Sequence, residues 1–199
     1  MILPSVTLFP GMMLPLYIFE PRYRSMLTDV LADNRMFAVA MQNPHDGYDE
    51  MPVEVGCLGM VRACVENPDG TSNLFLQGIV RVIINGKDEA AEYPVLEVEP
   101  VAPPSEPSIK SEALAIKVKE LVNERYGGLA TKAPPTQLEP SMPDVRQQLA
   151  DAISSVDSPA QLADMVTYAL IADPVRKQEM LETLSIEDRL DKVIHFLME

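Results

Sequence analysis

The sequence predicts an α+β fold in which a twisted antiparallel sheet with one helix precedes an α-helical bundle. Three observations support this prediction. β-branched residues and turn signals dominate the first half of the 199 residues, and helical periodicity dominates the second half. A proline-rich joint at 100–107 separates the halves, and prolines this dense exclude regular helix and central strand. We therefore expect a β-rich part at 1–102 and a helical part at 103–199.

Turn residues divide the β-rich part into short elements. The expected strands are 6–9, 12–18 (extended and interrupted by Pro15), 36–41, 54–66, 74–84 and 93–98. An amphipathic helix is expected at 21–32, because apolar residues recur there at helical spacing and Pro21 suits the first turn. Asn67–Gly70 and Asn85–Gly86 are expected to be tight turns, since glycine accepts a positive φ.

Start signals define the helices of the second part. Ser158, Pro159 and Gln161 form a capping box, with serine at the N-cap and proline at the first helical position. Asp173-Pro174 and Ser185-Ile186 start further helices in a similar way. The remaining expected elements are helices at 108–126 and 144–156 and a loop at 133–143.

Charge and composition narrow the classes of partner. The formal net charge is -14, which repels nucleic-acid phosphates and anionic lipid headgroups, so we expect neither nucleic acid nor membrane as a partner. Cys57 and Cys64 are the only cysteines and form no disulfide framework, which fits a reducing compartment. Because neither a signal peptide nor a membrane-length apolar run is visible, we expect a cytoplasmic protein. We also expect either a monomer or a weak homodimer.

A search for catalytic patterns yields only weak candidates. The sequence contains no phosphate-binding Gly-x-x-x-x-Gly-Lys-Ser/Thr loop and no Gly-x-Ser-x-Gly elbow. His45 is expected in a solvated turn and His195 on a helix surface. Glu97 and Glu99 share one face of a strand and could form a carboxylate pair, although a solvent-facing edge explains them as well. We expect no enzyme, no catalytic residue, no cofactor and no metal.

The segment 8–24, which contains Phe19-Glu20-Pro21-Arg22-Tyr23, resembles the opening motif of the Lon protease amino-terminal domain, in the form found in stand-alone Lon-domain proteins. The similarity continues through 55–59 and 76–82, which resemble paired strands of that family. It extends to 162–164, 178–184 and 189–190 in the helical half. The resemblance therefore covers nearly the whole chain.

This resemblance implies a PUA-like pseudo-barrel followed by a helical bundle. It also implies recognition of unfolded or tagged polypeptide, or an adaptor role in protein quality control, with a separate ATPase or protease as one candidate partner. It implies no proteolysis by this chain, because the ATPase and Ser-Lys peptidase modules of the protease are not in the sequence. PUA-like sheets elsewhere bind RNA, so an RNA-binding module is the alternative, although the acidic charge opposes it.

The expected polypeptide-binding residues are Met12, Met13, Leu14, Tyr17, Phe19, Arg22, Tyr23 and Arg24. Pro10 and Pro15 keep this segment from pairing fully as a central strand, so its side chains stay available. Aromatic residues tend to carry binding energy, and the arginines would favour an apolar peptide flanked by acidic residues. Alternatively, Phe19 and Tyr23 lock the helix to the sheet and Glu20 pairs with an arginine, which would make the motif a fold determinant.

Overall fold

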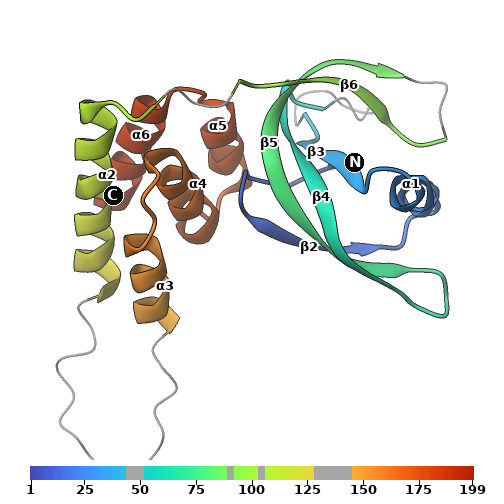
Figure 1. Cartoon of the computed structure of the whole chain (residues 1–199), viewed down its shortest axis with the longest axis horizontal. Coiled ribbons are helices and arrows are strands. Elements are labelled where there is room, and N and C mark those ends of the chain that lie inside the picture. Colours follow the sequence, from blue (N-terminus) through green and yellow to red (C-terminus); the bar gives the residue numbers. More distant parts are fainter. Residues whose placement is uncertain (44–51, 89–91, 103–105, 128–144) are drawn as a thin grey trace, which may run out of the picture. The chain divides into compact units, whose positions relative to one another are not determined.

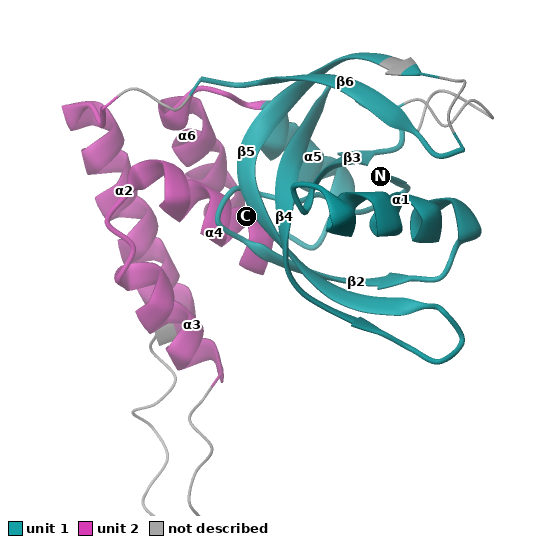
Figure 2. Cartoon of the chain, turned by 45° about the vertical axis from the view of Figure 1, so that its right-hand side comes forward, with its two compact units in different colours: residues 1–103, 171–182 teal, residues 104–170, 183–199 magenta. Residues whose placement is uncertain are grey.

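The computed structural model describes residues 1–43, 52–88, 92–102, 106–127 and 145–199 (Figure 1). His45, the centre of the proline-rich joint and the loop expected at 133–143 lie outside these described residues. The chain forms two compact units (Figure 2). The sheet unit contains 1–103 and 171–182, and the helical unit contains 104–170 and 183–199. This division differs from the expected boundary at 102, because 171–182 belongs to the sheet unit.

The sheet unit is built on six described strands. They are β1 (Ile2–Leu3), β2 (Met13–Ile18), β3 (Met36–Met41), β4 (Val55–Glu66), β5 (Ser72–Asp88) and β6 (Val95–Pro100). The strand order is β1-β3-β4-β5-β2, and β6 pairs with another part of β5. All pairs are antiparallel except β1 with β3. The α+β class is confirmed, but these strands form an open sheet and not the pseudo-barrel that we expected.

Two local expectations were wrong. Residues 6–9 form no strand, although Leu8 and Phe9 are fully buried, so their apolar character reflects core packing. Asn85–Gly86 is no turn but lies inside β5, where the pairing with β6 shifts register between Ile84 and Gly86. A residue pair suited to a tight turn thus forms an irregularity of a long strand, because tertiary pairing outweighs a local turn preference.

Helix α1 (Pro21–Ala32) confirms the expected amphipathic helix and packs on the sheet with Tyr23, Met26 and Leu27 buried. The core cluster around it consists of Met1, Leu8, Ile18, Tyr23, Met26, Leu27, Phe37, Val39, Cys57, Val61, Leu74 and Leu76. These residues come from α1 and from four of the strands, and also from the segments around them. Packing in this core therefore holds β2 and the first turns of α1 in fixed positions relative to each other.

Helix α5 (Pro174–Glu182) belongs to the sheet unit because two side chains hold it to strands. The Gln178 side-chain amide donates to the Val55 carbonyl at 2.8 Å. The buried Arg81 guanidinium donates to the Leu181 carbonyl at 3.0 Å, in the last turn of the helix. A cation is favourable at this end, where carbonyl groups carry partial negative charge.

The helical unit contains α2 (Ile109–Val122), a π-helical turn (Asn123–Gly127), α3 (Val145–Ser154), α4 (Pro159–Leu170) and α6 (Ile186–Met198). The expected start signals are confirmed, because Ser158 and Ser185 each accept a hydrogen bond from the backbone N–H three residues later and Asp173 accepts one from the Val175 N–H at 2.9 Å. Ser108 caps α2 in the same way as Ser158 and Ser185. Asp164 of α4 and Arg189 of α6 form a buried ion pair at 3.0 Å. Of the helices that the structure describes, none is both long enough and apolar enough to cross a bilayer.

Candidate functional site

The outer face of β2, β5 and β4 exposes apolar side chains. Odd-numbered side chains of β2 are exposed and even-numbered ones face the core, as the two-residue period of a strand requires. The strand register places Tyr17 beside Asn73 and Asn73 beside Val65, and it places Phe75 between Pro15 and Ala63. We call this surface the outer patch, defined by Met13, Pro15, Tyr17, Phe19, Ala63, Val65, Asn73 and Phe75.

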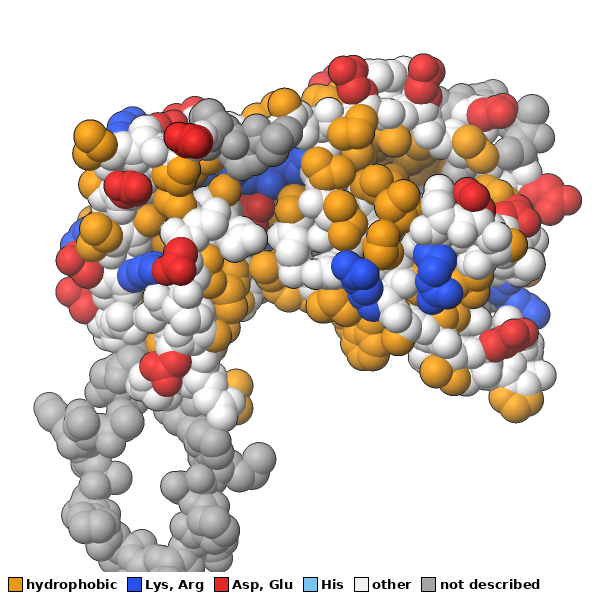
Figure 3. Space-filling view, in the orientation of Figure 1, with side chains coloured by type: hydrophobic (Ala, Val, Ile, Leu, Met, Phe, Trp, Pro, Cys, Tyr) orange, Lys and Arg blue, Asp and Glu red, His pale blue; other side chains and the backbone are white. Residues whose placement is uncertain are grey.

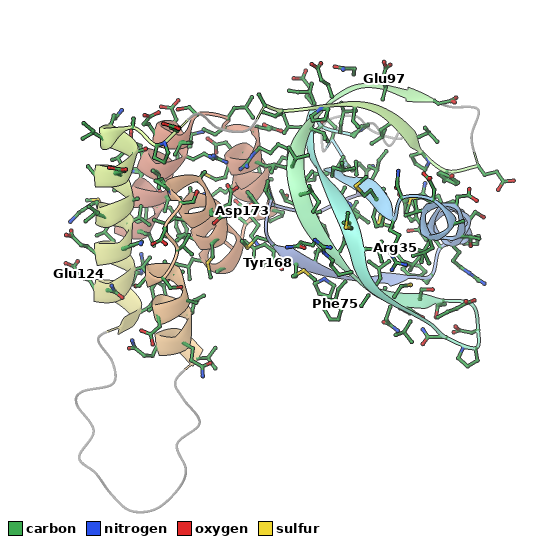
Figure 4. The ribbon with its side chains drawn as sticks, in the orientation of Figure 1. Arg35, Phe75, Glu97, Glu124, Tyr168 and Asp173 are labelled. Atoms are coloured by element: carbon green, nitrogen blue, oxygen red, sulfur yellow. The ribbon has the colours of Figure 1, made fainter. Side chains whose placement is uncertain are left out.

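The large side chains of the outer patch are well exposed. The exposed fractions are 53% for Tyr17, 58% for Phe19, 64% for Val65 and 50% for Phe75. The rings of Tyr17 and Phe19 stack with their centroids 5.8 Å apart. Phe75 projects from the sheet beside β2 in Figure 4, and hydrophobic side chains gather in areas of the sheet-unit face seen in Figure 3. Exposed apolar surface of this kind marks interaction sites.

A hollow of about 340 Å³ opens in the outer patch, lined by Pro15, Leu16, Tyr17, Ala63, Val65, Asn73, Leu74 and Phe75. Among the described side chains that line this hollow, only Asn73 and the hydroxyl of Tyr17 carry polar atoms. The hollow can therefore accept apolar side chains of a partner and offers one carboxamide for hydrogen bonding.

The structure divides the expected binding residues between the outer patch and the core. Met13, Tyr17 and Phe19 lie on the patch. Leu14 packs against the core cluster, and the half-buried Met12 uses its carbonyl to accept a hydrogen bond from Gly78 N–H at 2.9 Å. These last two residues position β2 and present little surface to a partner.

Tyr23 corrects the expectation most clearly. Its side chain is 3% exposed. Its hydroxyl donates to the Ile2 carbonyl at 2.8 Å and accepts from the Ile2 N–H at 3.2 Å. Tyr23 therefore ties α1 to β1 and offers no surface to a ligand, which is the role that the fold-determinant alternative gives it.

The two motif arginines are engaged on the α1 side. Arg22 Nε lies 2.9 Å from Glu20 Oε2, and its guanidinium covers the Tyr23 ring at 4.7 Å. Arg24 lies against Gly70 in the β4–β5 turn. The positive charge beside the outer patch instead comes from Arg62, whose Nε donates to Gln77 Oε1 at 2.6 Å. No local pattern in the sequence indicates a role for Arg62, because its position depends on strand register.

A second hollow, of about 370 Å³, lies between α1 and the β4–β5 turn; it is lined by Pro21, Arg24, Ser25, Leu27, Thr28, Leu31, Cys64, Glu66, Gly70 and Ser72. At the turn, the Asp69 carboxylate accepts hydrogen bonds from the Thr71 hydroxyl at 2.7 Å and the Thr71 N–H at 3.0 Å. These bonds, with a smaller contribution from Arg24, lower the pKa of Asp69 from its ordinary 3.8.

The Thr71→Val variant is expected to raise the pKa of Asp69 toward 3.8, because the strongest of these donors is lost. A depressed carboxyl pKa adds stability above the unfolded pKa that disappears as the pH falls through the folded pKa. Thr71→Val should therefore weaken the pH dependence of stability below about pH 4. Carbon-detected NMR titration of Asp69 measures the shift. Thr28→Val is the control, because the Thr28 hydroxyl donates to the Arg24 carbonyl and not to Asp69. An unchanged Asp69 pKa in Thr71→Val would contradict this account.

The other candidate groups are not among the residues of the outer patch. Glu97 and Glu99 are exposed on β6, where Figure 4 labels Glu97. Cys57 is buried and Cys64 lines the second hollow. His195 is exposed, with Nε2 3.6 Å from Glu199 Oε1. Within the described ranges, no three His, Cys, Asp or Glu side chains come together in a way that could hold a metal ion.

Comparison with known proteins gives consistent matches along the whole chain. The sequence model of the ATP-dependent protease La (LON) substrate-binding domain matches residues 1–199. Lon protease of Roseiflexus castenholzii is 28% identical over 197 residues, which cover 98% of this chain and 23% of that protein. Lon protease of Phenylobacterium zucineum is 30% identical, with 98% of this chain and 24% of that protein covered. The chain thus spans about a quarter of the length of these relatives.

Solved structures share the fold. The N-terminal domain of Mycobacterium avium complex Lon protease superposes with a TM-score of 0.76 at 18% identity, covering 100% of this chain and 96% of that one. A Lon N-terminal domain protein from Xanthomonas campestris has a TM-score of 0.68 at 19% identity, covering 98% of this chain and 96% of that one. At these identities the likeness concerns the fold.

Proposed function

This chain belongs to the family of substrate-binding domains of ATP-dependent protease La (Lon), and we propose that it captures unfolded or tagged polypeptide through the outer patch. The observation that carries the proposal is the cluster of exposed Tyr17, Phe19 and Phe75 around an apolar hollow. Unfolded segments expose the apolar side chains that folded proteins bury. Aromatic anchors in such a surface contribute much of the binding free energy.

We further propose that recognition is the whole task of this region. The similarity to Lon proteases is confined to about a quarter of their length, 23% in Lon protease of Roseiflexus castenholzii. ATP hydrolysis and peptide cleavage would then be performed by other modules, to which this domain delivers polypeptide as an adaptor in quality control. Cys57 and Cys64 form no disulfide, which fits a reducing cytoplasm, and a monomer or weak homodimer suffices for this role.

The chemistry of the outer patch favours polypeptide over RNA. Apart from Asn73, its hollow is lined by aliphatic and aromatic side chains, and the net charge of the chain is -14. RNA-binding surfaces combine stacking rings with several basic groups that neutralise phosphates.

The Phe75→Ser variant is expected to weaken binding of a permanently unfolded protein, such as reduced and carboxymethylated α-lactalbumin, by about tenfold or more. Full burial of a Phe side chain is worth about 1.5–3 kcal/mol, and about 1.4 kcal/mol is tenfold in Kd. Fluorescence anisotropy with the labelled unfolded protein measures Kd.

Val95→Ser is the matched control, because Val95 is also an exposed apolar strand residue but pairs with Asp88, far along β5 from the patch. Its Kd is expected to match that of the wild type. Both variants should retain the thermal midpoint to a similar degree, since Phe75 is 50% and Val95 is 42% exposed. Wild-type affinity in a folded Phe75→Ser protein would place the binding surface elsewhere.

A further inference from the structure

Arg62 lies at one end of the outer patch because β4 and β5 change register there. The shift between Val61 and Ala63 leaves Arg62 without a registered partner on β5. Its guanidinium bonds to Gln77, which is registered with Met13 of the patch. The cation therefore lies on the same face as the apolar side chains.

Among the residues that the structure describes, Arg62 has no counterion. No acidic side chain in the described ranges forms an ion pair with Arg62, whereas Arg22 has Glu20. Glu66, further along β4, lines the second hollow on the opposite face of the strand. An exposed arginine beside apolar surface, on a protein of net charge -14, provides a charge-selective contact for a bound carboxylate.

Asn73 supplies a second polar contact, between Tyr17 and Val65 in the hollow. Its exposed carboxamide makes no hydrogen bond to any part of the chain that the structure describes. A carboxamide presents a donor and an acceptor in one plane. The N–H and C=O of one residue in an extended chain point to the same side and match this pair.

From these contacts we propose that the outer patch selects an extended polypeptide segment in which an acidic residue lies near apolar residues. This inference rests on the proposed function and specifies its substrate class. The apolar side chain occupies the hollow against Tyr17 and Phe75, the segment's backbone bonds to the Asn73 carboxamide, and the carboxylate pairs with Arg62. Asn73 and Gln77 are four residues apart on β5, which is about 13 Å. The acidic residue is therefore about two to four residues from the anchoring side chain.

The test uses two synthetic nonapeptides with the same Phe-Leu anchor, one with Asp and one with Lys three residues from it. The wild type is expected to bind the Asp peptide about threefold to fivefold more tightly at low salt, with a smaller difference at high salt. Arg62→Gln should abolish this preference and Arg62→Glu should reverse it. Arg24→Glu, an exposed arginine on the α1 side, should keep the wild-type preference.

Asn73→Leu tests the backbone contact, because leucine has nearly the same shape but no hydrogen-bonding groups. We expect this variant to bind both peptides several-fold more weakly, although the hollow becomes more apolar. Equal or tighter binding by Asn73→Leu, or an unchanged Asp preference in Arg62→Glu, overturns the inference. Phe75→Ser should lose binding of both peptides whether or not the Asp preference exists. If Phe75→Ser still binds both peptides like the wild type, the proposed function itself fails, and not only the inference about the acidic residue.

Discussion

Asp164→Ala is expected to lower the free energy of unfolding by about 3–5 kcal/mol, the largest effect that we expect from a single side chain of the helical unit. Asp164 Oδ1 and Arg189 Nη1 are 3.0 Å apart, and the two side chains are 5% and 3% exposed. Removing the carboxylate leaves the Arg189 guanidinium buried between α4 and α6 without its counterion. The magnitude reflects this desolvated charge and not the intrinsic strength of the pair.

Urea unfolding followed by circular dichroism at 222 nm measures this effect. Lys117→Ala is the control, because Lys117 and Glu120 form an exposed pair at 3.3 Å, and such pairs contribute about 0.2–1 kcal/mol. The double variant Asp164→Leu with Arg189→Met should recover most of the lost stability, since it removes both charges and keeps the volume. A loss below about 1 kcal/mol in Asp164→Ala would contradict the account of a desolvated charge.

Gly78→Ala is expected to destabilise the sheet unit by about 3 kcal/mol or more, at or above the upper range for overpacking. The segment 9–12 crosses β5 at this residue: Gly78 N–H donates to the Met12 carbonyl and the Gly78 carbonyl accepts from Gly11 N–H, both at 2.9 Å. A Cβ on residue 78 would collide with the Phe9 carbonyl oxygen and approach Cys57 Sγ to 3.2 Å. Phe9 and Cys57 are fully buried, so neither has room to move away.

The same strand provides a matched control in Gly86→Ala. A Cβ at Gly86 would meet Glu97 Oε2 at 3.6 Å, which is ordinary van der Waals contact. This variant should be neutral or gain up to about 1 kcal/mol, because alanine restricts the unfolded chain. Hydrogen exchange of β5 amides and urea titration compare the two variants. Equal stability of Gly78→Ala and Gly86→Ala would contradict this account, because it would mean that the segment 9–12 can move away from a Cβ at residue 78.

Local signals in the sequence were sufficient for individual elements. The helix starts at Ser158, Asp173 and Ser185 and the apolar period of α1 are encoded within a few residues, so they could be predicted. The assignment of α5 to the sheet unit could not, because it depends on Gln178 reaching Val55, 123 residues away in sequence. Likewise, the irregular pairing at Gly86 depends on β6 and overrides the turn preference of Asn85–Gly86.

The candidate site shows the same limit. Tyr17 and Phe19 could be predicted because they belong to one short apolar segment. Phe75 and Val65 were missed, since they join that segment only through the strand register. A register shift of one residue would turn them to the opposite face. Arg22 and Tyr23 looked suitable for binding by residue type, but contacts within the fold occupy them.

The place of α5 in the sheet unit affects how the protein can fold during synthesis. Residues 1–103 leave the ribosome first, but their unit also needs 171–182. At about 5–20 residues per second, the missing helix emerges roughly 4–16 s later. Throughout that interval the nascent sheet lacks the Leu181 carbonyl that accepts from Arg81. Slow codons between residues 103 and 171 would lengthen the time during which the sheet unit is incomplete. A gene that ended between these residues would encode neither unit in full.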